Sequence, residues 1–177
     1  MTRRLTGAFT KSAVGFAALG QARSTLFKQN MLEKQSDWQK YEDYTRQILN
    51  DERVQKYLEK YFNLFNLVIK PKDKLPGIKT GTQWEVDGYG YDINDQLILI
   101  ECKHYKSDKV VQNTVAAFAY IIRDVEAKSG IIVTTFGLQF GAIKVARTED
   151  IGLIKLHYNS TNKNFLLNSN PYLKNQV

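Results

Sequence analysis

Residues 84–105, WEVDGYGYDINDQLILIECKHY, decide the fold of this chain. The stretch contains two runs of strand-forming residues, 84–91 and 97–105. Between them stand Asn94 and Asp95, which tolerate the backbone conformations that a tight hairpin turn requires. The sequence therefore predicts an antiparallel β-hairpin here.

The length of the turn sets the register of this hairpin. If residues 93–95 form a three-residue turn, Asp92 lies opposite Gln96, and the same register places Asp87 opposite Glu101. A slip of one residue would move Asp87 to the other face of the hairpin. The turn therefore decides whether these two carboxylates meet.

The segments around the hairpin alternate between helical and strand-like patterns. The continuous apolar run that begins at Gly130 is typical of a strand buried on both faces. We expect helices over residues 38–49, 53–65, 110–125 and 138–147, strands over 67–69, 130–135 and 151–156, and an exposed loop over 70–82. This order predicts an α/β sandwich with a central mixed β-sheet flanked by helices.

Composition limits the classes of protein to which the chain can belong. With 177 residues, 43% of them hydrophobic, it is long enough for one domain with a proper core. One cysteine and two histidines exclude a Cys/His zinc site within the chain. The net charge of +7 comes from the two ends, because residues 1–40 and 155–177 hold an excess of basic side chains and residues 41–154 are close to neutral.

The first 35 residues differ from the rest of the chain. No acidic residue occurs before Glu33, and a helix here would place Arg3, Arg4 and Lys11 opposite an apolar face. Such a segment is typical of a mitochondrial transit peptide, and equally of a basic arm that lies on nucleic acid. We expect a mitochondrial matrix location if the source is eukaryotic and a cytoplasmic one otherwise.

These features predict three regions and no membrane span. They are a basic amphipathic leader over residues 1–35, a folded domain over 36–158 and a polar tail over 159–177. No run in the chain approaches the roughly 20 apolar residues that cross a bilayer.

Two charged residues interrupt the second strand of the hairpin. Glu101 and Lys103 are two residues apart, so they share one face of the strand, while Cys102 and His104 point to the other. We expect Cys102 in the core and His104 as a packed or surface histidine. Burying two charges on one face is costly unless each has a partner or a metal. With Asp87, they would supply hard oxygen ligands for Mg²⁺ and a positive charge for a phosphate, which is the equipment of a phosphodiesterase. The alternative is an ion pair on an exposed edge strand.

The order of these motifs resembles a known family. Asp87, followed by Ile100-Glu101-Cys102-Lys103, is similar to the Asp…Glu-x-Lys signature of the PD-(D/E)xK nucleases, in particular the Mrr-like restriction endonucleases. The run GIIVTTFG at residues 130–137, and the helix and strand expected after it, resemble the elements that follow in that group. Val86 stands where the family name has proline.

The resemblance implies a role for each residue that matches the motif. Asp87 and Glu101 would be metal ligands, and Lys103 would be the catalytic lysine. Glu42 resembles the upstream acidic residue that often completes the metal site, although it would equally fit a solvated helix face. Gln112 occupies the position of a polar residue that relatives place near the site. The metal would be Mg²⁺, with Mn²⁺ as a substitute.

The resemblance also implies a function. We expect a Mg²⁺-dependent endonuclease that hydrolyses DNA phosphodiester bonds by metal-activated water, with a homodimer left open. One alternative is a nucleic-acid-binding or genome-maintenance factor that keeps the fold with little or no catalysis. A nuclease for RNA or branched DNA is another, because the fold does not separate these substrates.

Overall fold

The computed structural model describes residues 36–157, so the predicted leader and tail lie outside the described residues. In chain order the elements are α2 (Asp37–Leu49), α3 (Glu52–Phe62), β1 (Asp73–Pro76), β2 (Gln83–Val86), β3 (Gly88–Tyr91), β4 (Leu97–Lys103), α4 (Gln112–Asp124), β5 (Ser129–Thr134), α5 (Phe140–Thr148) and β6 (Gly152–Lys155).

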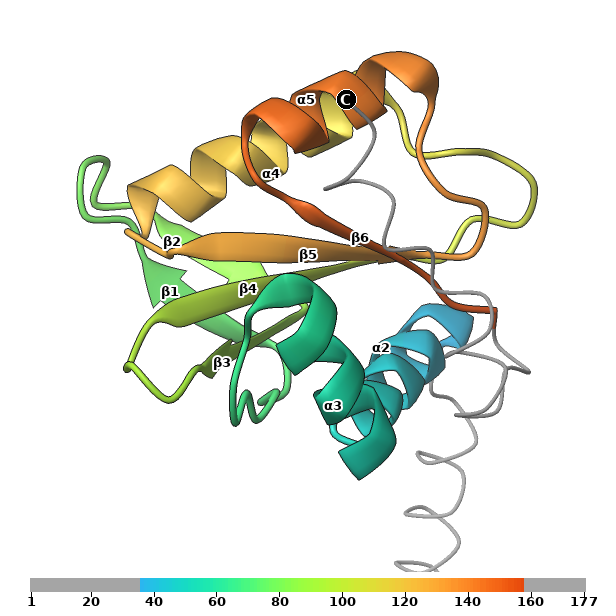
Figure 1. The fold of residues 1–177 in the computed structure, drawn as a ribbon. Helices are drawn as coiled ribbons and strands as arrows, with labels where there is room; N and C mark the ends of the chain where they lie inside the picture. Colours follow the sequence, from blue (N-terminus) through green and yellow to red (C-terminus); the bar gives the residue numbers. More distant parts are fainter. Residues whose placement is uncertain (1–35, 158–177) are drawn as a thin grey trace, which may run out of the picture. The chain divides into compact units, whose positions relative to one another are not determined.

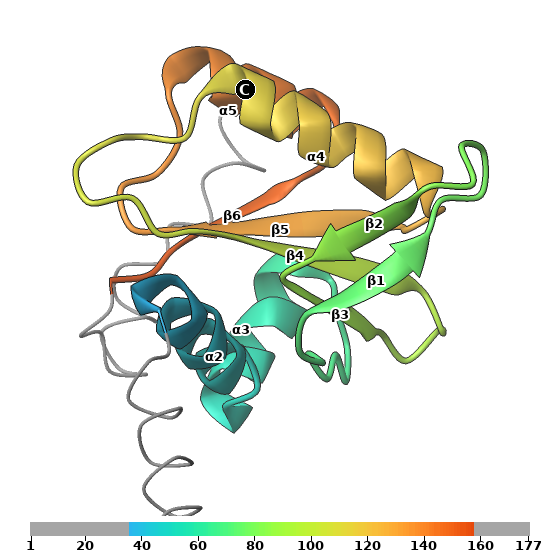
Figure 2. The same cartoon turned by 180° about the vertical axis from the view of Figure 1, so that it is seen from behind.

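A mixed four-stranded sheet forms the centre of the fold, in the order β3-β4-β5-β6. β3 and β4 are antiparallel, whereas β4, β5 and β6 are parallel. Helices α2 and α3 cover one face of the sheet, and α4 and α5 cover the other (Figures 1 and 2). The predicted α/β sandwich with a central mixed sheet is confirmed.

The strand β4 has apolar residues on both faces because both faces are covered. Ile98, Ile100 and Cys102 belong to the core beneath α2 and α3, whereas Leu99 belongs to the core beneath α4 and α5. All four side chains are buried. An uninterrupted apolar run of this kind is typical of a strand between two helix layers.

The strand predicted over residues 84–91 is divided in two. β2 ends at Val86 and pairs with β1 in a separate two-stranded sheet, and β3 begins at Gly88 in the main sheet. Gly88 lies so close to the backbone of Lys70 that an added Cβ would be 3.2 Å from its carbonyl oxygen. Asp87 is therefore the one residue between two strands that belong to different sheets.

Two other expectations were wrong. Residues 67–69 form no strand, and the only pairing described near them is a single bridge between Lys70 and Tyr89. The stretch 70–82 is not wholly a loop, since it contains β1. The sequence Asp-Lys-Leu-Pro has low strand propensity, so β1 depends on its pairing with β2.

The loop that joins β1 to β2 is attached to the end of α4 through Asp124. The buried Asp124 carboxylate accepts hydrogen bonds from the backbone N–H groups of Lys79 and Thr80, both at 3.1 Å, and from Trp84 Nε1 at 2.6 Å. Its backbone carbonyl accepts another from Ile78 N at 2.7 Å. This carboxylate therefore has donors on several sides.

Within residues 36–157, no helix has the length and apolar character needed to span a bilayer.

Candidate active site

The turn of the β3–β4 hairpin has the predicted form. The backbone N–H of Asp92 donates to the carbonyl of Gln96 at 3.1 Å, and the Asp92 carboxylate accepts from the backbone N–H groups of Asn94 and Gln96 at 2.8 and 3.0 Å. These bonds outweigh the effect of burial and lower the pKa of Asp92. Asp92 is thus a turn residue and lies at the far end of the hairpin from Asp87.

The register that follows from this turn is also as predicted. Gly88 lies opposite Ile100 and Tyr91 opposite Leu97, so the same register continued by one residue brings Asp87 to Glu101. One oxygen of Asp87, Oδ2, accepts a hydrogen bond from the backbone N–H of Cys102 at 2.8 Å. A side-chain oxygen thus extends the pairing of β4 past Gly88, the first residue of β3.

Glu101 and Lys103 form an ion pair at the carboxyl end of β4. Each side chain is only 17% exposed, and Nζ of Lys103 contacts Oε1 of Glu101 directly. Burial raises the pKa of Glu101, and the Lys103 charge opposes this while the nearby Asp87 charge adds to it. Burial lowers the pKa of Lys103, but attraction and hydrogen bonding to Glu101 outweigh it, so the net pKa is raised and the side chain stays an ammonium.

Helix α2 brings Glu42 to the same place. Its Oε1 atom is buried and accepts no hydrogen bond from the described residues. Burial raises the pKa of Glu42, and the negative charge of Asp87 raises it further. The three predicted metal ligands are therefore electrostatically coupled, with Asp87 acting on both glutamates.

Trp38 belongs to this cluster, although the sequence reasoning did not place it in the site. Its ring centroid lies 5.5 Å from Nζ of Lys103, and its side chain opposes the rise in the pKa of Glu42. Residues four apart share one face of a helix, so the spacing of Trp38 and Glu42 was the signal that could have revealed it.

Lys72 is a second basic residue at this edge. It pairs with Glu85 at 2.7 Å. Its positive charge also opposes part of the rise in the pKa values of Glu42 and Glu101. Glu85 is thus an exposed partner of Lys72. No local pattern predicts the position of Lys72, because that position depends on the pairing of β1 with β2.

Three further predictions concern Cys102, His104 and Gln112. Cys102 is buried, and the ring of His104 stacks on that of Tyr41, with centroids 4.7 Å apart, so both pack as expected. Gln112 is exposed at the start of α4, with its amide oxygen beside Gly141 of α5. A role for Gln112 in the reaction stays a prediction.

The donor set fits a divalent cation chemically, although the side chains are not gathered as a finished metal site. The part of the chain that the structure describes contains no group of three His, Cys, Asp or Glu side chains placed to hold a metal ion. Yet among the described residues Glu42 presents a buried oxygen with no hydrogen-bond partner near Asp87, which in turn acts on Glu101, and Mg²⁺ prefers carboxylate oxygens as ligands. Asp87, Glu101 and Glu42 are therefore the residues that would hold it.

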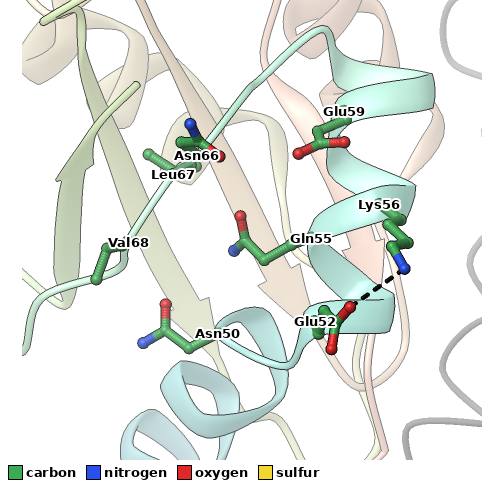
Figure 3. A pocket seen from close by; sticks show the side chains of 8 residues that line it. All are labelled: Asn50, Glu52, Gln55, Lys56, Glu59, Asn66, Leu67 and Val68. Carbon is green, nitrogen blue, oxygen red and sulfur yellow. Dashed lines mark hydrogen bonds and ion pairs between the residues drawn. The ribbon is translucent and has the colours of Figure 1, made fainter. Parts of the chain in front are cut away.

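A separate cavity of about 600 Å³ lies along α3 (Figure 3). None of the predicted site residues lines it. Its walls come from Asn50 between α2 and α3, from α3, where Lys56 pairs with Glu52 at 3.2 Å, and from the segment 66–68. The lining residues are Asn50, Glu52, Gln55, Lys56, Glu59, Asn66, Leu67 and Val68.

Comparison with protein families identifies the chain. The model of the restriction endonuclease family, for its Mrr catalytic domain, matches residues 67–157, about half of the chain. The chain belongs to the Mrr restriction endonuclease family. The match contains Asp87, Glu101, Lys103 and Gln112, whereas Glu42 lies before it. No curated protein matches the chain significantly.

Solved structures similar to this member of the Mrr family share little sequence with it. A protein of unknown function, AF1548, is 18% identical with a TM-score of 0.49, over 64% of this chain and 56% of that one. A repair endonuclease from Pyrococcus abyssi is 17% identical with a TM-score of 0.36, over 61% and 48%. EndoMS in a complex with double-stranded DNA is 20% identical with a TM-score of 0.38, over 60% and 44%. The chain spans about half the length of these structures.

Proposed function

We propose that the protein is a divalent-metal-dependent endonuclease that hydrolyses DNA phosphodiester bonds. The observation that carries this proposal is that Asp87, Glu101 and Lys103 meet at the carboxyl end of the buried strand β4. Membership of the Mrr restriction endonuclease family supports it.

The cost of burying these charges supports a catalytic role. A carboxylate with a raised pKa is less stable in the fold than in water, and Glu42 and Glu101 are both of this kind. A protein that only bound a polyanion would gain nothing from acidic side chains at its binding surface. Perturbed carboxylates are instead typical of sites that do chemistry.

Lys103 would act as a positive charge toward the substrate. Because its pKa is raised, the side chain is an ammonium at neutral pH and cannot accept a proton from water. It is therefore suited to stabilise negative charge on the phosphate under attack. Contact with Glu101 and the ring of Trp38 fix the position of its Nζ atom.

Asp87, Glu101 and Glu42 would hold Mg²⁺, or Mn²⁺ in its place. When bound, such a cation lowers the pKa of its water and stabilises charge on phosphoryl oxygens. Asp87 reaches this position because its Oδ2 atom is fixed by the backbone N–H of Cys102.

Cleavage assays test this proposal directly. Purified wild-type protein and Lys103→Ala would be incubated with supercoiled plasmid, linear duplex, branched DNA and RNA, each with Mg²⁺ or EDTA. The matched control is Lys60→Ala, which removes an exposed lysine of α3 that belongs neither to the candidate site nor to the loops after β4 and β5. We expect nicking of DNA that needs Mg²⁺ and Lys103 and persists in Lys60→Ala.

Each other outcome would change the proposal. Cleavage that survives EDTA or Lys103→Ala contradicts the mechanism. Cleavage of RNA or branched DNA alone would move the substrate to that class. Binding without cleavage of any substrate would identify a non-catalytic nucleic-acid-binding factor.

A further inference from the structure

Large apolar side chains are exposed around the loops that follow β4 and β5. Phe140 is 73% exposed, the highest value among the large hydrophobic side chains of the described residues, and Val111 and Phe136 are 43% and 38% exposed. We call the surface of residues 105–111 and 135–144 the end surface. It includes these apolar side chains and the exposed lysines between and beside them. Exposed apolar groups gathered in one place often mark an interaction site.

Hydrogen bonds join the two loops of the end surface. Thr135 Oγ1 donates to the carbonyl of Tyr105 at 2.8 Å, and the backbone N–H of Gln139 donates to the carbonyl of Val110 at 2.9 Å. Val111 is therefore held beside the start of α5, where Phe140 is the first residue.

The end surface is continuous with the candidate active site. Lys103 is the last residue of β4, and it lies opposite Thr134, the last residue of β5. The two loops start directly after these residues, at the same end of the two strands (Figure 1). In sheets of this type, ligands bind at the carboxyl ends of parallel strands.

The charge of the end surface suits a polyanion. Lys106, Lys109 and Lys144 are exposed, and none of them takes part in an ion pair with the described residues. Asp108 is the one acidic residue in these two segments. Lys144 Nζ lies 4.6 Å from the centroid of the Phe140 ring, so a positive charge accompanies the most exposed aromatic group.

We propose that the end surface binds the nucleic acid beside the cut and that Phe140 inserts into its base stack. Aromatic and other apolar side chains that enter a base step unstack it, while nearby lysines hold the flanking phosphates. The bound form would be DNA with an unpaired or easily unstacked base close to the phosphate at Lys103. This inference rests on the proposed function and specifies its substrate.

Fluorescence of 2-aminopurine tests the insertion. The protein would carry Lys103→Ala, so that Mg²⁺ could be present without cleavage, and the probe would be a 20-mer duplex with 2-aminopurine beside one unpaired base. We expect binding to raise the 2-aminopurine emission. Adding Phe140→Ala should remove this rise and weaken binding by about 5- to 100-fold, the range for one base stacked on an aromatic group. A fully paired duplex should bind more weakly and show a smaller rise.

The matched control is Phe65→Ala. Phe65 is 40% exposed, and its carbonyl accepts a hydrogen bond from Ile93 in the hairpin turn, at the opposite end of β4. We expect Phe65→Ala to keep both affinity and emission. Circular dichroism and the melting temperature of Phe140→Ala should match the parent, because the Phe140 side chain buries little area.

The lysines have an independent readout. Lys106→Ala and Lys109→Ala should each reduce the slope of log affinity against log salt concentration by about one. They should leave the 2-aminopurine rise at saturation unchanged, since their contacts would be with phosphates.

Several results would overturn the inference. Unchanged emission and affinity in Phe140→Ala would overturn it. The absence of DNA binding by the Lys103→Ala protein would overturn it as well. If Phe140→Ala instead halved the mass measured by light scattering without changing DNA affinity, the end surface would belong to a second copy of the chain. If binding and emission behave as expected but the wild type cleaves nothing, the proposed function fails and the insertion stands.

Discussion

Buried and partly buried carboxylates occur in two contrasting settings in this domain. Asp124 and Asp92 accept hydrogen bonds from backbone and side-chain donors, and these bonds lower both pKa values. For Glu42 and Glu101, the effect of burial outweighs that of the favourable charges and hydrogen bonds around them, so both pKa values are raised. The first pair stabilises the loops that hold the fold together, whereas the second pair costs stability at the place where we expect chemistry. A buried acid is therefore informative only together with its partners.

The largest effect should come from removing the charge of Asp87 while keeping its shape. Asp87→Asn retains an oxygen that can accept from Cys102 N–H, so the sheet should persist. Loss of a metal ligand should reduce DNA cleavage by roughly 10³-fold, equivalent to about 4 kcal/mol. Single-turnover cleavage in Mg²⁺ measures this. Asp95→Asn, which changes an exposed acid in the hairpin turn at the far end of β4, is the control and should cleave normally.

Glu42→Gln should change activity and stability in opposite directions. Because the pKa of Glu42 is raised in the fold, its carboxylate costs stability at any pH above its ordinary pKa. Removing the charge should therefore raise the melting temperature in EDTA at pH 7.5 by a few degrees, while cleavage falls by about 10- to 100-fold.

The control for Glu42→Gln is Glu52→Gln, which changes an exposed acid that pairs with Lys56 of the same helix. It should leave both quantities nearly unchanged. A lower melting temperature for Glu42→Gln would contradict the view that Glu42 is a costly group.

Asp124→Ala should show the reverse pattern. The variant leaves the N–H groups of Lys79, Thr80 and Trp84 without their acceptor, so the melting temperature should fall by several degrees. Below the new melting temperature, cleavage per folded molecule should stay close to wild type. Thermal unfolding followed by circular dichroism, with activity at 20 °C, checks both. Complete loss of activity in a folded variant would show that Asp124 belongs to the site.

Acid should remove the stability that Asp124 supplies. A carboxyl whose pKa is lowered in the fold stabilises it above the ordinary pKa, and this contribution is lost as the pH falls through the folded pKa. The wild-type melting temperature should therefore decrease as the pH is lowered below about 4. The decline should be shallower in Asp124→Ala, measured from pH 2.5 to 6 in EDTA. Equal slopes would assign the acid sensitivity to other groups.

The smallest effect should come from Trp38. Trp38→Leu removes the ring beside the Lys103 ammonium and a group that lowers the pKa of Glu42, and should lower single-turnover cleavage by about two- to fivefold. Trp38 emission in a Trp84→Phe background should also change when Mg²⁺ is added, which a purely structural residue would not show. No spectral change on Mg²⁺ addition would place Trp38 outside the site.

The sequence predicted the parts of this structure that depend on local pattern. A three-residue turn at residues 93–95 predicted the observed register, with a slip by one residue left open, and the structure confirms the alternative that brings Asp87 to Glu101. The alternation of Cys102 and Lys103 on β4 followed from strand geometry alone.

The parts that it missed depend on tertiary pairing. β1 has no strand signal of its own, and the change of sheet at Asp87 has no signature in the run WEVDGYGY. The position of Lys72 at the site follows from that pairing. The contact between Trp38 and Lys103 joins segments far apart in the chain, so spacing could indicate only that Trp38 and Glu42 share a helix face.

The hydrogen bond between Asp87 and Cys102 has a consequence for comparing homologues. A copy of this domain that had lost the reaction would still need an acceptor at position 87 to finish the edge of its sheet, so aspartate there would be retained for architecture. Glu42 has no comparable structural role among the described residues, and selection for stability alone would replace it. Among homologues, the acid on α2 is thus the more sensitive marker of which copies still cut.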